Sequence, residues 1–156
     1  MKSKPPTKSS TPTVTRQELI QLLNEDLARE YHAVIAYVNY SQVLKGAEYM
    51  QIAKELELHA TEELAHALII AKQVDYLGGE PSVTPTPVKT SKNAKDMLRF
   101  DLADEIDTIR NYRVRLKQAE SLGEYAISES IREILVQEQE HAIDLATALG
   151  IEVPRV

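Results

Sequence analysis

The segment Asp26-Leu-Ala-Arg-Glu30 returns 75 positions later as Asp101-Leu-Ala-Asp-Glu105. The same offset relates three further pairs of residues: Tyr37 and Tyr112, Glu63 and Glu138, and His66 and His141. Each half of the chain therefore carries two Glu residues, with a His three positions after the second of them. A single Glu-x-x-His is a common chance pattern, but two copies with matching upstream Glu residues are not. The repeat predicts a two-metal site formed by four helices.

The repeated carboxylates lie on the faces of the predicted helices that point into the core. Apolar residues recur every three or four positions, and the Glu and His residues interrupt these stripes. Buried carboxylates must be paired or bind metal. Two divalent ions would balance four carboxylates and two neutral imidazoles, and mixed oxygen and nitrogen donors favour two iron ions per chain, with manganese possible. The predicted metal ligands are Glu30, Glu63, His66, Glu105, Glu138 and His141.

Capping residues, glycines and prolines mark the ends of four long helices. Thr15-Arg-Gln-Glu18 is a capping box that opens the first of them. The predicted helices span about 15–44, 47–77, 93–121 and 124–149. The linker of about 15 residues between the second and third can return along the whole bundle at ~3.3 Å per residue. The predicted fold class is all-α, a four-helix bundle with a long crossover between the second and third helices.

Composition limits both the domain organisation and the chemistry. We expect residues 1–14 to form a disordered tail, residues 15–150 to form the bundle domain, and residues 151–156 to form a short C-terminal tail. The absence of Cys excludes disulfides and thiolate chemistry. The net charge of -6 makes a nucleic-acid partner an unfavoured interpretation. Apolar runs are too short for a membrane span, so we expect no membrane partner and a cytoplasmic location.

Tyr37 and Tyr112 lie seven residues after Glu30 and Glu105, in the same core-facing stripes. A tyrosine in such a stripe usually packs in the core. The same position would also bring a phenol beside the metal ligands, where it could orient them or take part in redox chemistry. Both interpretations stay open. Tyr37 and Tyr112 are therefore candidate catalytic residues that would contact the metal ligands rather than the metal ions.

Four other polar residues of the predicted helices also have an interpretation. Asp26 and Asp101 lie one turn before a predicted ligand, and we favour a role in orienting a ligand His over a simple surface charge. His59 lies one turn before Glu63 and is interpreted as a core histidine rather than as a third ligand. His32 is interpreted as a solvated residue.

With these residues identified, the chain resembles the ferritin superfamily, and most closely its bacterioferritin branch. The likeness covers nearly all of residues 16–150, and Met97-Leu-Arg-Phe-Asp-Leu-Ala-Asp-Glu-Ile-Asp107 is especially similar to the third helix of that branch. The resemblance implies a ferritin-like bundle in which the six predicted ligands form a ferroxidase site. It further implies that Glu63 and Glu138 bridge two iron ions, that the other two Glu residues are terminal, and that each His binds one iron.

Two departures from the bacterioferritin pattern change these expectations. Bacterioferritins that bind haem use a Met directly after the Glu of the first Glu-x-x-His, and Leu64 stands at that position, so no haem is predicted. The chain ends soon after the predicted fourth helix, so we expect no short fifth helix of the kind that closes the four-fold axis of 24-subunit cages. We expect a homo-oligomer, either a dimer or a smaller Dps-like shell.

Three functions fit these features. The leading hypothesis is a ferroxidase of the bacterioferritin type, which oxidises Fe(II) with O2 or H2O2 for iron storage or detoxification. The alternative is a peroxidase or oxidase of the rubrerythrin or catalase-like kind, which retains its two metals as cofactor. A non-enzymatic Dps-like shell that binds DNA through the Lys-rich tail ranks third, because this chain supplies a full metal site by itself.

Overall fold

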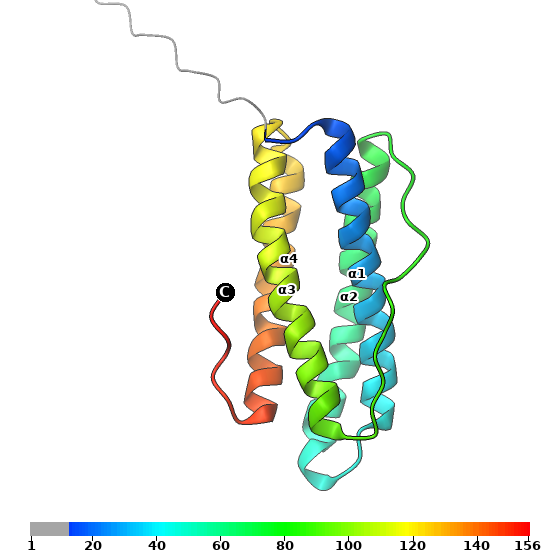
Figure 1. The fold of residues 1–156 in the computed structure, drawn as a ribbon, viewed down its shortest axis with the longest axis vertical. Coiled ribbons are helices and arrows are strands. Elements are labelled where there is room, and N and C mark those ends of the chain that lie inside the picture. Colours follow the sequence, from blue (N-terminus) through cyan, green and yellow to red (C-terminus); the bar gives the residue numbers. More distant parts are fainter. Residues whose placement is uncertain (1–12) are drawn as a thin grey trace, which may run out of the picture.

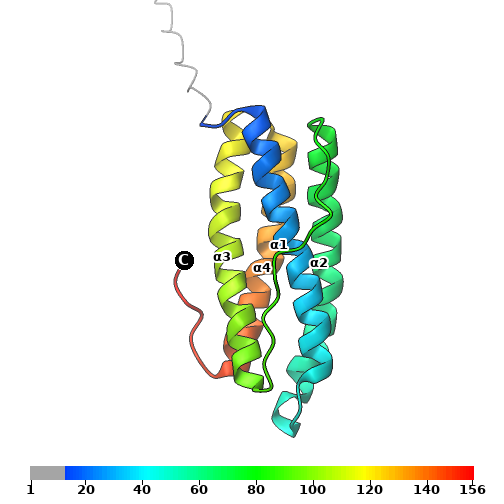
Figure 2. The ribbon, with the colours of Figure 1, turned by 45° about the vertical axis from the view of Figure 1, so that its right-hand side comes forward.

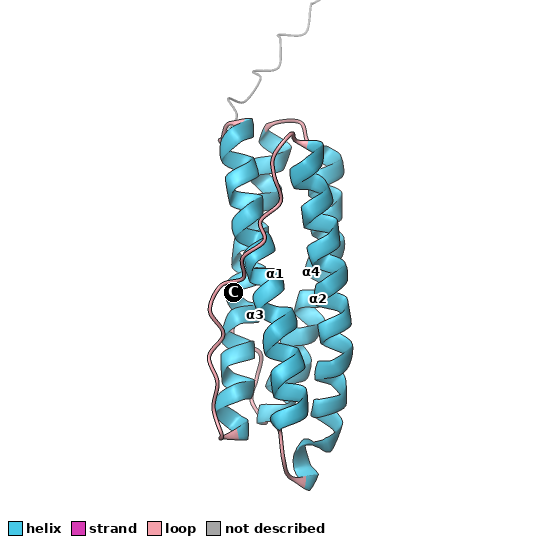
Figure 3. Ribbon diagram, turned by 90° about the vertical axis from the view of Figure 1, so that its right-hand side faces the viewer, coloured by secondary structure: helices cyan, strands magenta, loops and turns pink. Residues whose placement is uncertain are grey.

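The computed structural model describes residues 13–156, which form four long helices packed as a bundle (Figure 1). Most of the predicted tail, residues 1–12, lies outside the described residues. Figure 3 shows helices and loops but no strand in the described residues, so the prediction of an all-α four-helix bundle is confirmed. The helices are α1 (Arg16–Val43), η1 (Ala47–Tyr49), α2 (Met50–Tyr76), α3 (Ala94–Ser121) and α4 (Tyr125–Leu149).

The helix ends follow the capping signals in the sequence. Thr15 Oγ1 accepts a hydrogen bond of 3.1 Å from the backbone N–H of Glu18, and Glu18 Oε2 accepts one of 2.7 Å from Thr15 N–H. This reciprocal pair is the predicted capping box. The predicted second helix instead starts with a 3₁₀ turn, and Gly46 just before it adopts a φ of 122°, a conformation that favours glycine.

The linker between α2 and α3 runs along α1 for most of the length of the bundle (Figure 2). Ser82 N–H donates to Asn24 Oδ1 at 2.8 Å, and Thr86 N–H donates to the carbonyl oxygen of Ala28 at 3.2 Å. Further along, the Tyr40 hydroxyl donates to a linker carbonyl. The chain thus returns to the end of the bundle where α2 began, and α2 and α3 run parallel, as the length of the linker predicts.

The apolar core has two clusters, one toward each end of the bundle, with a polar layer near mid-height. Each fully buried Leu or Ile stabilises the fold by about 1.5–3 kcal/mol. One cluster includes Leu56, Met97, Leu98 and Leu145, and the other includes Leu19, Leu23, Ile70, Ile127 and Ile131. These clusters fix the four helices around the polar layer. None of the helices within residues 13–156 is long and apolar enough to cross a membrane.

Candidate metal centre

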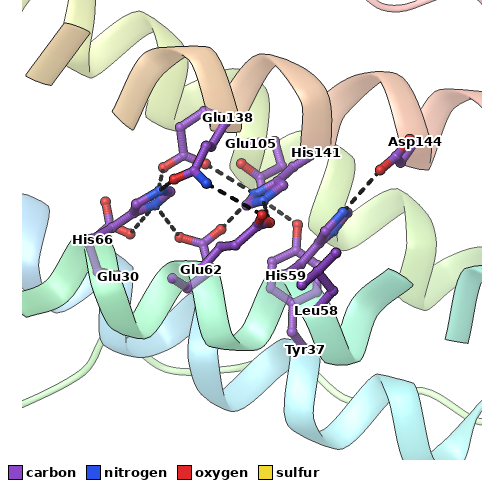
Figure 4. A network of polar contacts seen from close by, with 12 residues as sticks. Glu30, Tyr37, Leu58, His59, Glu62, His66, Glu105, Glu138, His141 and Asp144 are labelled. Atoms are coloured by element: carbon purple, nitrogen blue, oxygen red, sulfur yellow. Dashed lines mark hydrogen bonds and ion pairs between the residues drawn. The ribbon is translucent and has the colours of Figure 1, made fainter. Parts of the chain in front are cut away.

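The six predicted ligands meet near the middle of the four helices. Figure 4 shows Glu30, His66, Glu105, Glu138 and His141 among them. Each of them is at most 3% exposed to solvent. The helix α1 provides Glu30 and α3 provides Glu105, while α2 and α4 each provide one Glu-x-x-His pair. Because residues three apart lie on the same side of a helix, both members of each pair point inward. The structure therefore brings together all six side chains that the repeat singles out.

Two overlapping groups of four donors form the centre. One group contains Glu30 and His66, the other contains Glu105 and His141, and both contain Glu63 and Glu138. Within each group, one donor atom from each residue lies within 4.8 Å of the others. Two neighbouring four-donor groups that share two carboxylates have the arrangement that a pair of bridged metal ions requires.

The imidazole Nδ1 atoms face the shared carboxylates. Nδ1 of His66 lies 3.0 Å from Glu63 and 3.3 Å from Glu138. Nδ1 of His141 lies 2.9 Å from Glu63 and 3.5 Å from Glu138. Both carboxylates are thus within reach of both imidazoles, as expected of bridging positions.

The protein alone does not satisfy these donors. Within the described part of the chain, neither carboxylate oxygen of Glu138 makes a well-aligned hydrogen bond, and they lie 3.3 Å and 3.5 Å from the Nδ1 atoms of His66 and His141. Leaving a buried polar group without a partner costs about 1–3 kcal/mol, and the cost is larger when the group is charged. The donors are only oxygen and nitrogen, a set that suits iron or manganese. The residues present therefore fit two divalent cations.

Burial and mutual repulsion change the proton affinity of the carboxylates. Burial, with the charges of neighbouring carboxylates, raises the pKa of Glu63 well above its ordinary value and that of Glu105 to about 7. Burial alone would lower the pKa of His66 and His141, but hydrogen bonds to the surrounding carboxylates outweigh it and raise both. In the absence of cations, the centre therefore holds protons.

The two repeated tyrosines contact the outer carboxylates. The Tyr37 hydroxyl donates a hydrogen bond to Glu105, and the Tyr112 hydroxyl donates one to Glu30. Each tyrosine thus bonds to the Glu of the other half of the repeat. Burial raises the pKa of both phenols well above their ordinary value, so both remain protonated donors. Whether they also act in redox chemistry stays a prediction.

Glu62 and Gln137 hold the outer nitrogens of the two imidazoles. His66 Nε2 lies 2.7 Å from Gln137 Oε1, and His141 Nε2 lies 2.7 Å from Glu62 Oε2. Such outer contacts keep a ligating ring in position. Glu62 and Gln137 were not predicted as functional residues. A signal was present, because they are also 75 positions apart and directly precede the two shared Glu residues.

The predicted role of Asp26 and Asp101 is wrong. Asp26 is buried and bonds to Arg115, at 2.6 Å to Nε and 3.2 Å to an outer guanidinium nitrogen. No hydrogen bond joins Asp101 to a histidine within residues 13–156. Arg115 is only 4% exposed and was not anticipated as a core residue. An aspartate one turn from a ligand is therefore not enough to define its partner.

The predictions for the other two histidines, His32 and His59, had different outcomes. His32 is not a solvated residue: it is partly buried and bonds to Asp104 at 2.9 Å and to the carbonyl oxygen of Thr86 at 3.2 Å. The linker beside α1 covers it. His59 is buried, as predicted for a core histidine, and its Nε2 lies 3.1 Å from Asp144.

A pocket of about 450 Å³ connects the centre to the face of the bundle formed by α1 and α3. Its lining includes four carboxylates of the centre: Glu30, Glu63, Glu105 and Glu138. Arg29, Asp104, Asp107 and Arg110 are among the other residues that line it. Small polar molecules and hydrated cations can therefore reach the carboxylates from this face.

Comparison with known proteins agrees with this architecture. The ferritin-like domain family matches residues 20–152. The bacterioferritin of Brucella melitensis is 28% identical over 135 residues, which cover 86% of this chain and 84% of that protein. The bacterioferritin of Desulfovibrio desulfuricans is 29% identical over 127 residues, covering 81% of this chain and 71% of that protein.

Two solved structures share the fold. One belongs to the ferritin-like, diiron-carboxylate proteins from Bacillus anthracis, with a TM-score of 0.82, 31% identity, and coverage of 86% of this chain and 96% of that chain. The other is a dodecameric thioferritin, the bacterioferritin-related protein from Bacteroides fragilis. It has a TM-score of 0.81, 26% identity, and coverage of 88% of this chain and 87% of that chain.

Proposed function

The chain belongs to the ferritin-like domain family, and from this premise we propose that it is a ferroxidase of the bacterioferritin type, which oxidises Fe(II) with O2 or H2O2 for iron storage or detoxification. The observation that carries the proposal is the pair of four-donor groups sharing Glu63 and Glu138. Bacterioferritins among its relatives and a diiron-carboxylate protein among its structural neighbours support the same chemistry.

In this proposal the substrate Fe(II) enters through the pocket between α1 and α3. Glu63 and Glu138 bridge the two Fe(II) ions. The terminal ligands are Glu30 with His66 on one ion and Glu105 with His141 on the other. Two Fe(II) together release two electrons, which with two protons reduce O2 to H2O2 or reduce H2O2 to water. The protons that the imidazoles and carboxylates hold leave as the cations bind.

The surrounding residues hold the ligands rather than react. Tyr37 and Tyr112 donate to the terminal carboxylates and so fix their orientation. Glu62 and Gln137 hold the outer imidazole nitrogens, which keeps both Nδ1 atoms directed at the bridging carboxylates.

Iron loading tests the proposal directly. When Fe(II) is added in air to metal-free protein at rising ratios, we expect the protein to keep far more than two iron ions per chain in solution. Storage as a mineral inside an assembly is the reason for this excess. Protein-bound iron is counted after gel filtration, and a protein-free sample, in which ferric iron precipitates, is the control.

A plateau at two iron ions per chain would instead favour the second candidate, a peroxidase or oxidase that retains both metals. The two buried phenols beside the terminal carboxylates are the observation that favours it. That outcome would be followed by assays of H2O2 consumption with an electron donor. The two functions thus differ in stoichiometry before any kinetic measurement.

Assembly is the second part of the proposal, and a groove between α1 and α2 provides a surface for it. The groove includes Val38 and Leu64, which are 53% and 50% exposed. Leu68, one turn further along α2, is 66% exposed. The relative from Bacteroides fragilis is dodecameric, and we propose that a second copy of this chain covers these apolar side chains.

The double variant Val38→Glu with Leu64→Glu is expected to dissociate the oligomer. Two buried, unpaired carboxylates in an apolar interface would each oppose association by several kcal/mol. Analytical ultracentrifugation at micromolar protein concentration gives the mass. Val136→Glu on α4, where the wild-type side chain is 63% exposed, is the matched control and should keep the wild-type mass. A wild-type mass for the double variant would place the interface elsewhere.

A further inference from the structure

Four polar residues on α2 and α4 break the internal symmetry of the metal centre. The offset of 75 positions that relates the two halves places uncharged residues at each of the corresponding positions. Glu55, His59, Glu62 and Asp144 correspond to Ser130, Ile134, Gln137 and Ile69. The chain therefore carries three carboxylates and an imidazole that have no titratable counterpart at the corresponding positions of the repeat.

Three of these side chains form a compact group on the face between α2 and α4. One donor atom from each of Glu55, His59 and Asp144 lies within 4.8 Å of the other two. His59 Nε2 lies 3.1 Å from Asp144 Oδ2, and Figure 4 shows the imidazole directed at this carboxylate. His59 is 2% exposed, whereas both carboxylates are partly exposed. A pocket of about 190 Å³, lined by Glu55 and Asp144, opens the group to solvent.

One of the two ring nitrogens of the buried His59 lacks a partner in the described part of the chain. His59 Nδ1 is buried and has no hydrogen-bond partner among residues 13–156. If the proton is on Nδ1, the lone pair of Nε2 points at the carboxylate of Asp144, and the two repel each other. A cation between Nε2 and the carboxylates would convert this repulsion into attraction. With its proton on Nδ1, His59 has Nε2 available to bind a cation together with the two carboxylates.

We propose that Glu55, His59 and Asp144 form a further divalent-cation site, separate from the six-residue centre. Two carboxylates and a neutral imidazole carry a charge of -2, which matches one divalent cation. Oxygen and nitrogen donors suit Fe(II), Co(II) and Zn(II). This inference goes beyond the proposed function, because it requires cation binding only and no oxidation.

The further site adjoins the six-residue centre through a pair of stacked rings. The ring centroids of His59 and His141 are 4.0 Å apart, with an interplanar angle of 27°. Glu62, which contacts His141, also forms a possible donor group with both histidines. The site lies on the α2/α4 side of the bundle, opposite the α1/α3 pocket. A cation bound here would be next to the centre but would have its own opening to solvent.

Anomalous diffraction from crystals of the full-length, metal-free protein soaked in Co(II) tests the inference. Co(II) is not oxidised under these conditions. Anomalous difference density, measured at the absorption edge of cobalt, shows the position of each bound ion. We expect three cobalt positions per chain, two within the six-residue centre and one in contact with His59 Nε2. In solution, equilibrium dialysis should likewise give three Co(II) per chain.

The double variant Glu55→Gln with Asp144→Asn is expected to bind two Co(II) per chain, with both ions still in the six-residue centre. Glu133→Gln, an exposed charge change on α4, is the matched control and should keep three. Cobalt in the six-residue centre but not at His59 in the wild-type crystals would overturn the inference and leave the proposed function intact. Cobalt at His59 but not in the centre would support the inference and contradict the proposed function.

Discussion

Replacing Glu138 with Gln is expected to slow rapid Fe(II) oxidation by at least about 100-fold, because even residues that only hold a metal ligand contribute 10–100-fold. Glu138 belongs to both four-donor groups, so its loss removes one carboxylate from each. The centre would then present three negative charges to two divalent ions. Stopped-flow absorbance of Fe(III), after mixing two Fe(II) per chain with aerated buffer, measures the rate.

Glu140→Gln is the matched control for this prediction. It removes the same charge from the same helix, but Glu140 is exposed and belongs to neither donor group. Its rate should equal that of the wild type. The metal-free Glu138→Gln variant should still fold, because both apolar clusters that hold the four helices together are unchanged. Wild-type kinetics in Glu138→Gln would exclude the two-ion mechanism.

The fold and the six-residue centre were predictable because their signals are local or repeated. Glycines and the capping box at Thr15 mark helix ends, and they depend only on residues a few positions apart. The Glu-x-x-His spacing places two donors on one helix face without reference to any other helix. The offset of 75 positions then shows that two halves contribute equivalent donors to one centre. The proposed limits of the domain and its tails stay predictions.

Contacts between different helices were not predictable in the same way. Asp26 and Arg115 are 89 positions apart, and their contact depends on how α1 and α3 are rotated about their axes. A stripe of apolar residues gives the buried face of each helix but not which residues on two faces meet. The contact between His59 and Asp144, across α2 and α4, depends on packing in the same way. Polar pairs of this kind require the packed bundle.

The free energy of unfolding of the metal-free protein is expected to fall as the pH rises from about 5 to about 8. Burial raises the pKa of Glu105 from an ordinary value of 4.5 to about 7, and it also raises the pKa of Glu63 well above its ordinary value. Between these values the folded state binds a proton that the unfolded state has released, so stability decreases with pH. The raised pKa values of His66 and His141 act in the same direction above 6.5.

The size of this decrease is several kcal/mol. The shift of Glu105 alone corresponds to about 3 kcal/mol, at 1.36 kcal/mol per pKa unit. Glu138, whose pKa is lowered by hydrogen bonds from the histidines despite its burial, acts in the opposite direction. His59, whose pKa is lowered by burial and by the neighbouring His141, also acts in the opposite direction, which gives two such groups against at least four. Thermal unfolding followed by circular dichroism, in the presence of a chelator, measures the trend.

Binding of Co(II) should reverse the trend, because cations and protons compete for the same donors. Ligands must lose their protons to bind metal, so cation affinity rises with pH. At a free concentration 1,000 times the dissociation constant, one cation adds about 4 kcal/mol. We therefore expect the gain in Tm with Co(II) to be small at about pH 5 and largest at about pH 8. A gain in Tm that did not depend on pH would contradict this prediction, because Co(II) would then bind without displacing a proton.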